Sequence, residues 1–183
     1  MKTALLIIDI QNDYFEGGTM TLVGADKAVE NARLILDRFR SDKLPVIHIQ
    51  HIAISPTATF FLKDTVGAEI HKSVSPLENE KVIEKHYPNS FRETNLLDYL
   101  QKNGVTDIVI CGMMTHMCVD ATTRAAKDFG FICTVIGDAC ATRNLEVNGQ
   151  SVEASEVQKS FLAALSYFYS TVNTAAQYLE GGK

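Results

Sequence analysis

The sequence predicts a single three-layer α/β domain, in which a mostly parallel six-stranded sheet lies between two layers of helices. Short unbroken apolar runs, such as LLII at 5–8 and IVIC at 108–111, are typical of strands buried on both faces. Segments with helical periodicity alternate with these runs, as expected for parallel strands joined by helices. A chain of 183 residues that is 46% hydrophobic and 21% charged suits one domain spanning 1–183.

The runs and the segments between them predict six strands and four helices. In chain order the expected strands are Ala4–Ile8, Val46–Ile49, Lys81–Glu84, Ile108–Cys111, Phe131–Ile136 and a short one at Thr171–Val172. We expect the Rossmann-like sheet order 3-2-1-4-5-6. The third helix should end before Gly130, because glycine adopts a left-handed cap at little cost. The expected helices are Ala25–Ser41, Arg92–Lys102, His116–Phe129 and Ser155–Tyr167.

Composition and charge exclude several classes of partner. The net charge is −5, from 17 basic and 22 acidic side chains with no basic stripe, which disfavours nucleic acid and anionic membranes. The apolar run near the N-terminus is too short to span a bilayer, and no small-residue cleavage site follows it. With these partners disfavoured, we expect a small-molecule partner. The four cysteines lack C-x-x-C spacing, so we expect a reducing cytoplasm.

Three polar residues follow apolar or strand-forming runs at positions where a ligand is expected. Asp9 ends the first run, Lys85 ends the third, and Cys118 lies in the turn after the fourth. Ligands of open α/β sheets bind beyond the carboxyl ends of the strands, so these side chains are candidates for a base, a cation and a nucleophile.

The chemistry of this trio depends on the state of the thiol. A free cysteine has a pKa of about 8.5, and only the thiolate is the nucleophile. Cys118 is expected in the first helical turn after an N-cap at Thr115, so the helix dipole and the nearby Lys85 should favour the thiolate. Asp9 would then take the thiol proton and return it to a leaving nitrogen, without any histidine.

Each of the three residues also has an ordinary structural interpretation. Asp9 can cap the turn that follows it, and Lys85 can be a solvated lysine. Cys118 can be a small buried hydrophobe, which is how we interpret Cys111 and Cys133 inside their strands. Position in the sequence does not decide between these alternatives.

The segment IVICGMMTHMCVDATTRAAKDFGF resembles the central signature of the isochorismatase-like cysteine hydrolases, which are related to nicotinamidases and N-carbamoylsarcosine amidase. The segments LLIIDIQNDYFEGG, EKHYPNSFRETNLLDYLQKNGV and VIGDACAT are similar to other parts of the same family, so the resemblance spans nearly the whole chain. It implies a catalytic triad of Asp9, Lys85 and Cys118. It also implies a cis peptide between Met113 and Met114, with an oxyanion hole formed by the N–H groups of Met114 and Cys118. The alternative is two methionines that fill the core.

Departures from the nicotinamidase pattern predict that no metal or other cofactor is needed. Gln50 lies about where those enzymes have a metal-binding aspartate, and no histidine follows His51 before His71. His48 and His51 are three residues apart, so on a continuous strand they point to opposite faces.

The retained cysteine favours cleavage of an amide-type substrate over the vinyl-ether hydrolysis of isochorismatase. A non-catalytic relative that binds a partner is a second alternative. A receiver-type signalling domain is a third, but that fold needs an acceptor aspartate after the central strand, and this sequence has none there. The resemblance places Tyr14 beside the substrate, and His116 precedes the nucleophile. Both residues can instead serve packing alone.

The aperiodic stretch Ala53–Pro76 is expected to form a loop or lid over the pocket. Phe60 and Phe61 lie in it and can close over a ligand, or pack against their own domain or a partner subunit. Members of the family commonly oligomerise, so we expect a dimer or tetramer of this chain.

Overall fold

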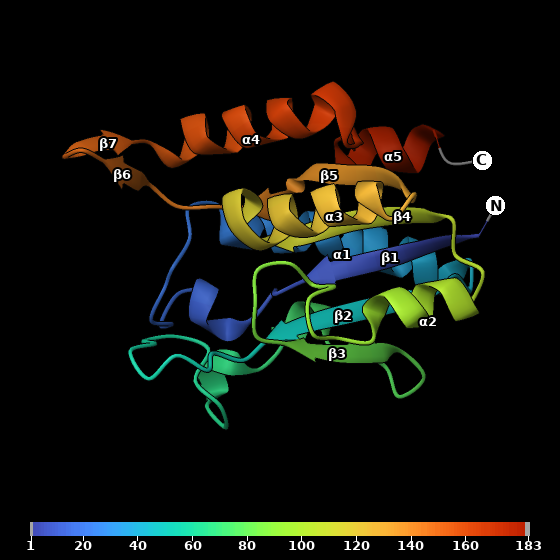
Figure 1. The fold of residues 1–183 in the computed structure, drawn as a ribbon, viewed down its shortest axis with the longest axis horizontal. Helices are drawn as coiled ribbons and strands as arrows, with labels where there is room; N and C mark the ends of the chain where they lie inside the picture. The colour runs from blue at the N-terminus through green and yellow to red at the C-terminus, as the bar shows by residue number, and fades with distance from the viewer. Residues whose placement is uncertain (1, 182–183) are drawn as a thin grey trace.

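The computed structural model describes residues 2–181, in which six parallel strands form one sheet covered by helices on both faces (Figure 1). The strands are β1 (Thr3–Ile8), β2 (Val46–His51), β3 (Lys81–Lys85), β4 (Asp107–Met113), β5 (Ile132–Ala141) and β8 (Thr171–Asn173). Their order is β3-β2-β1-β4-β5-β8, and every neighbouring pair is parallel. The expected α/β fold and strand order are confirmed, with β8 as the sixth strand.

Strand β1 illustrates why the apolar runs are unbroken. Leu5 and Ile7 pack into the core on one face of the sheet, whereas Leu6 and Ile8 pack into the core on the other. All four side chains are at most 2% exposed. A strand with helices on both sides has no solvent-facing positions, so its polar residues are confined to its ends.

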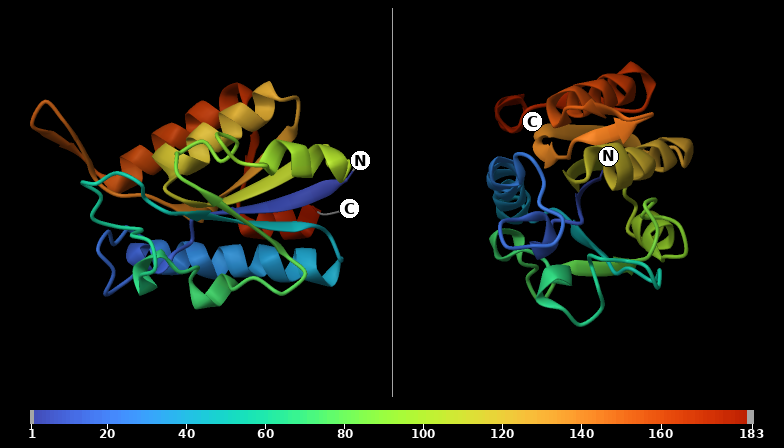
Figure 2. Two further views of the ribbon diagram at one scale, coloured as in Figure 1. Left: turned by 60° about the horizontal axis from the view of Figure 1, so that its bottom comes forward. Right: turned by 90° about the vertical axis from the view of Figure 1, so that its left-hand side faces the viewer.

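The helices divide between the two faces (Figure 2). Those bounding the first core are α1 (Ala25–Ser41) and α5 (Ala175–Gly181). Those bounding the second are α2 (Leu96–Lys102), α3 (Asp120–Asp128) and α4 (Ala154–Phe168). Helix α1 buries residues spaced three or four apart, which is the pattern of an amphipathic helix on a core: Ala25, Ala28, Val29, Ala32, Ile35, Leu36 and Phe39.

Two expected helices are shorter than the sequence pattern predicts. The helix expected from Arg92 begins at Leu96, because Asn89 and Thr94 bond nearby backbone groups and Glu93 has a φ of 57°. The helix expected from His116 is split into the π-helix η4 (Thr115–Val119) and α3. Thr115 is not the N-cap: that position belongs to Met114, which makes no side-chain capping bond.

Two features were not predicted. Helix α5 follows β8, and the antiparallel hairpin β6 (Leu145–Val147) and β7 (Gln150–Val152) extends from the body beside α4 (Figure 1). Asn148 and Gly149 turn the hairpin with φ angles of 52° and 75°. An Asn-Gly pair is a strong hairpin signal, so the sequence did contain the information.

The aperiodic stretch Ala53–Pro76 is held against the loop that follows β1. This loop contains the 3-10 turn η1 (Asn12–Tyr14), and the stretch contains η2 (Val66–Ala68) and η3 (Lys72–Val74). Gln11 donates from Nε2 to Ala68 O at 2.7 Å, and Phe61 N–H donates to Asp13 Oδ2 at 2.6 Å. The function of this stretch as a lid stays a prediction.

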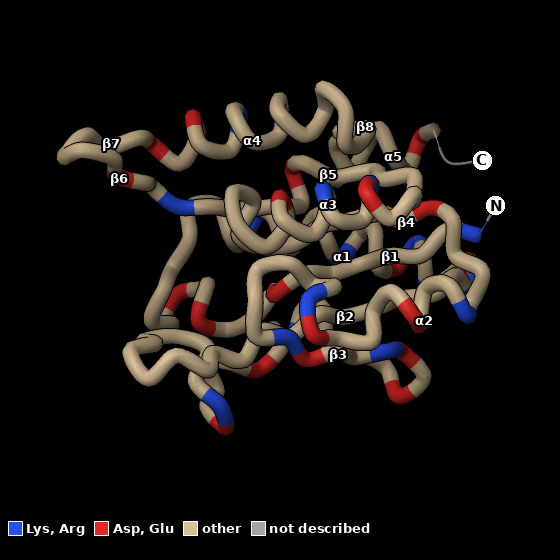
Figure 3. Tube along the Cα trace, viewed as in Figure 1, with Lys and Arg blue, Asp and Glu red and all other residues tan. Residues whose placement is uncertain are grey.

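Acidic and basic residues are interspersed along the described chain (Figure 3). Among residues 2–181, no helix has the length and apolar character required to cross a bilayer.

Candidate active site

The fold brings Asp9, Lys85 and Cys118 together at the carboxyl end of the sheet. Lys85 Nζ lies 2.8 Å from Asp9 Oδ2 and 3.2 Å from Cys118 Sγ. The side chains of Asp9 and Lys85 are fully buried, and Cys118 is 5% exposed. The interpretation of Lys85 as a solvated lysine is therefore wrong, because its ammonium lies inside the protein between the other two residues.

A glycine in the neighbouring strand allows this close assembly. Gly112 pairs with Ile8 in the β1–β4 register and has a φ of 135°. A Cβ atom at Gly112 would collide with the backbone of Ile8, so only glycine fits here. Asp9 comes directly after Ile8 and turns the chain with a φ of 50°, in the left-handed region that aspartate tolerates better than most residues.

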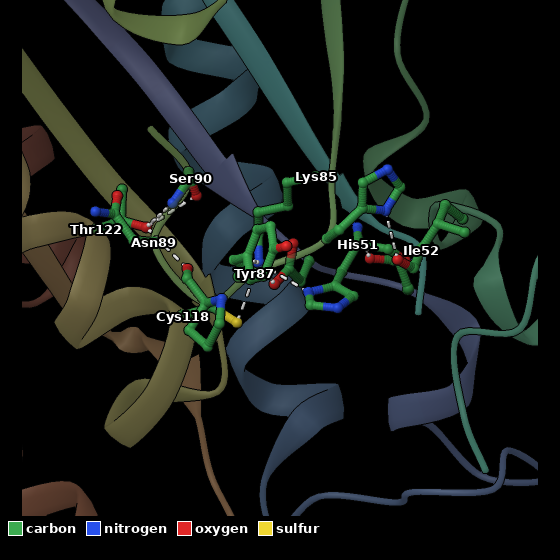
Figure 4. A network of polar contacts seen from close by, with 12 residues as sticks. His51, Ile52, Lys85, Tyr87, Asn89, Ser90, Cys118 and Thr122 are labelled. Carbon is green, nitrogen blue, oxygen red and sulfur yellow. Dashed lines mark hydrogen bonds and ion pairs between the residues drawn. The ribbon is translucent and has the colours of Figure 1, made fainter. Parts of the chain in front are cut away.

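Lys85 has two further acceptors that the sequence reasoning missed. Its Nζ lies 3.0 Å from His51 Nδ1 and 3.0 Å from the carbonyl oxygen of Tyr87. In Figure 4 the lysine amine lies between the His51 ring and the Cys118 sulfur. The strand register explains the contact with the histidine, because His51 ends β2 directly opposite Lys85.

Burial and the neighbouring charges act in opposite directions on Lys85 and in part on Cys118. It lowers the pKa of Lys85, but Asp9 and Cys118 outweigh it, so the pKa is raised and the ammonium is retained. Burial, reinforced by Asp9, raises the pKa of Cys118 despite the opposing effect of Lys85. The effect expected of Lys85 thus has the right direction, but burial outweighs it, so the pKa of Cys118 lies above that of a free thiol.

His51 is neutral at physiological pH. Burial lowers its pKa to about 4, a shift that Asp9 opposes and Lys85 and His86 reinforce. His48 is directed elsewhere, with Nε2 2.9 Å from Glu80 Oε2. The two histidines thus have separate partners, as their odd spacing predicted.

Residues 3–166 match the model of the isochorismatase domain. The chain belongs to the isochorismatase family. It is 51% identical over 180 residues to the uncharacterized isochorismatase family protein YddQ of Bacillus subtilis, covering 98% of this chain and 100% of that protein. A crystal structure from Oleispira antarctica is similar with a TM-score of 0.94 and 46% identity, covering 98% and 97% of the two chains. The N-carbamoylsarcosine amidase of Thermoplasma acidophilum is similar with a TM-score of 0.81 and 27% identity, covering 96% and 97%.

Three aromatic rings, those of Tyr14, Phe60 and Phe61, form an aromatic wall beside Asp9, Lys85 and Cys118. The Tyr14 ring lies 4.7 Å from Phe61 and 6.1 Å from Phe60, and Phe61 lies 5.8 Å from His51. Burial raises the pKa of Tyr14, and Cys118 and Asp9 raise it further, so the phenol keeps its proton. The structure therefore brings three of the four predicted pocket residues together.

The fourth predicted pocket residue, His116, has other neighbours. Its Nδ1 lies 2.6 Å from Thr142 Oγ1, and its ring packs edge-on against Phe161 at 5.9 Å. Within residues 2–181, His116 makes no hydrogen bond, ion pair or ring contact with Asp9, Lys85 or Cys118.

The family resemblance also concerns the turn before Cys118. The peptide bond between Met113 and Met114 is cis, and both side chains are buried. The carbonyl oxygen of Met114 accepts hydrogen bonds from the N–H groups of Met117 and Val119, at 3.0 and 3.3 Å. The oxyanion hole at Met114 and Cys118 stays a prediction.

Asp9, His51 and Cys118 are also residue types that bind metals, with candidate ligand atoms within 4.8 Å of one another. The Lys85 ammonium contacts all three and supplies a positive charge among them. A metal ion would have to compete with this charge, which is consistent with the prediction that the site needs none.

Proposed function

We propose that the protein is a cysteine-dependent amidohydrolase that cleaves the C–N bond of a small amide-type substrate through an acyl thioester on Cys118. The observation that carries the proposal is the buried cluster in which Lys85 Nζ contacts both Asp9 and Cys118. The similarity to an N-carbamoylsarcosine amidase supports the same class of bond.

Asp9 begins the reaction by taking the proton of the Cys118 thiol. Lys85 stabilises the resulting thiolate, and Sγ attacks the substrate carbonyl carbon to give a tetrahedral intermediate. Asp9 then gives the proton to the leaving nitrogen as the C–N bond breaks. Water next attacks the thioester, and Asp9 transfers a proton from water to the departing sulfur.

Two backbone N–H groups would stabilise the oxyanion of both tetrahedral intermediates. In this proposal they belong to Met114 and Cys118, at the start of η4. Tyr14, Phe60 and Phe61 form the aromatic wall that orients the substrate. A wall of this kind excludes water, so the charge developing on the carbonyl oxygen interacts more strongly with these N–H groups.

Ammonia or amine release from a panel of amides and ureido compounds tests the proposal. The wild type should release product, and Cys118→Ala should lose at least about 10³-fold in rate because the nucleophile is gone. Cys133→Ala is the matched control, since Cys133 is buried in β5 away from the triad. Mass spectrometry should detect an acyl adduct on Cys118. A fully active Cys118→Ala variant would refute the mechanism, and inactivity of the wild type on all amides would favour vinyl-ether chemistry or a non-catalytic function.

We further propose that the protein acts in the cytoplasm as a homo-oligomer on a small molecule, independently of nucleic acid. The four cysteines are unpaired, which suits a reducing compartment. Tyr167 and Phe168 of α4 are 92% and 64% exposed, which suits a contact with a second copy. Light scattering of the purified protein should give at least twice the chain mass of 20.2 kDa. The mass of a single chain would contradict this part.

A further inference from the structure

The Lys85 ammonium has more acceptors than hydrogens. An ammonium carries three N–H groups and accepts none. Four acceptors lie within 3.2 Å of Lys85 Nζ: Asp9 Oδ2, His51 Nδ1, Tyr87 O and Cys118 Sγ. One of the four is therefore without a full hydrogen bond at any moment.

The two partners that can be left out are the weaker acceptors, His51 and Cys118. Asp9 is charged and lies closest, at 2.8 Å, and the Tyr87 carbonyl belongs to the chain immediately after Lys85. A neutral thiol accepts hydrogen bonds weakly, whereas a thiolate accepts them strongly. Lys85 should thus donate to His51 while Cys118 is a thiol, and to Sγ once Cys118 is ionised.

The tautomer of His51 follows from the same geometry. A neutral imidazole accepts at one ring nitrogen and carries its proton on the other. Because Nδ1 faces Lys85, the proton of His51 is on Nε2. The ionisable groups that act on His51 are Asp9, Lys85 and His86. Those that face Cys118 are Asp9, Lys85 and the phenol of Tyr14.

We propose that His51 is a positioning residue that sets how readily Cys118 ionises, by competing with the sulfur for one N–H of Lys85. When the thiol proton moves from Sγ to Asp9, one Lys85 N–H turns from His51 Nδ1 to Sγ, and no other bond is made or broken. Its importance for catalysis rests on the proposed function, but the competition itself is a property of the free protein.

Removing the competitor should make the thiol more acidic. In His51→Phe, Lys85 is left with three acceptors, one for each N–H, so Cys118 Sγ keeps its hydrogen bond. We expect the pKa of Cys118 to fall by about one unit, so that its alkylation by iodoacetamide at a fixed pH below that pKa becomes about tenfold faster. His51→Asn restores a neutral acceptor close to the position of Nδ1, so its alkylation profile should match that of the wild type.

Alkylation is followed by mass spectrometry of the Cys118 peptide between pH 6 and 11. His86→Phe is the control, because the ring of His86 bonds Ile52 O and makes no contact with Lys85. The proposal is overturned if Cys118 of His51→Phe is alkylated no faster than that of the wild type at the same pH, or if His51→Asn is accelerated as much as His51→Phe.

A measurement on the wild type keeps the test independent of how the variants fold. Nitrogen NMR of histidine-labelled protein should give His51 as the neutral Nε2–H tautomer, with Nδ1 hydrogen-bonded at neutral pH; an Nδ1–H tautomer would refute the competition. The two proposals fail separately: inactivity on every amide refutes the proposed function, whereas the alkylation profiles alone decide the competition.

Discussion

The buried ion pair makes a quantitative prediction about stability. Lys85→Met removes the only ammonium that contacts Asp9 within the described residues and leaves a carboxylate that is 0% exposed. Breaking a buried pair by removing one partner costs about 3–5 kcal/mol, because the remaining charge is neither paired nor hydrated. His51 Nδ1 and Tyr87 O lose a donor as well. Urea unfolding should show a midpoint lowered by about 1–5 M, given slopes of about 1–3 kcal/mol per M.

Two further variants separate burial from charge. Asp9→Asn combined with Lys85→Met removes both charges and should recover more than half of the lost free energy of unfolding. Lys102→Met breaks the Lys102–Asp98 pair, which is as short, at 2.6 Å, but 75% and 66% exposed. It should change the free energy of unfolding by less than about 1 kcal/mol. A Lys85→Met variant that is no less stable than Lys102→Met would refute the reasoning.

Three other predictions concern the base, a second buried network and the strand contact. Asp9→Asn should lower amide turnover by about 10²–10⁴-fold, measured at saturating substrate, because the proton acceptor is lost. Burial raises the pKa of Glu80, but hydrogen bonds from Arg40, the Leu77 N–H and His48 lower it to about 2. The stabilisation by this carboxylate is therefore complete above about pH 4.5 and lost as pH falls through 2. The melting-temperature difference between wild type and Glu80→Gln should shrink over that range, and a constant difference would contradict it. Gly112→Ala should unfold the protein or cost more than about 3 kcal/mol, because its Cβ would collide with the Ile8 backbone. Gly104→Ala has open space but a φ of 67°, so it should cost only about 1–2 kcal/mol of left-handed strain.

Several features of the site could be predicted from local sequence signals. Asp9 and Lys85 each terminate a strand, and ligands bind at such ends in parallel sheets. Position alone did not distinguish Cys118 from the other three cysteines. The family resemblance did. The Asn148-Gly149 hairpin was equally local, and it was overlooked.

Other features depend on contacts between distant segments. Thr115 is a good N-cap residue by type, yet its hydroxyl donates to Gln158 Oε1 at 2.6 Å, 43 positions away. The start expected at Arg92 fails for a more local reason, because Asn89 Oδ1 accepts from the Phe91 N–H and Thr94 Oγ1 donates to Ser90 O. Propensity describes neighbours along the chain, and tertiary hydrogen bonds override it.

The sequence by itself determined the parallel sheet, its order and the residues that end its strands, because burial on both faces requires unbroken apolar runs and excludes charge from strand interiors. Only the tertiary structure decided the state of the site. Burial raises the pKa of the Cys118 thiol, whereas Asp9 and Cys118 keep Lys85 an ammonium against the effect of burial. The β2–β3 register places His51 against that ammonium. Ionisation depends on desolvation and on charges a few ångströms away, and both are set by segments that are distant in the sequence.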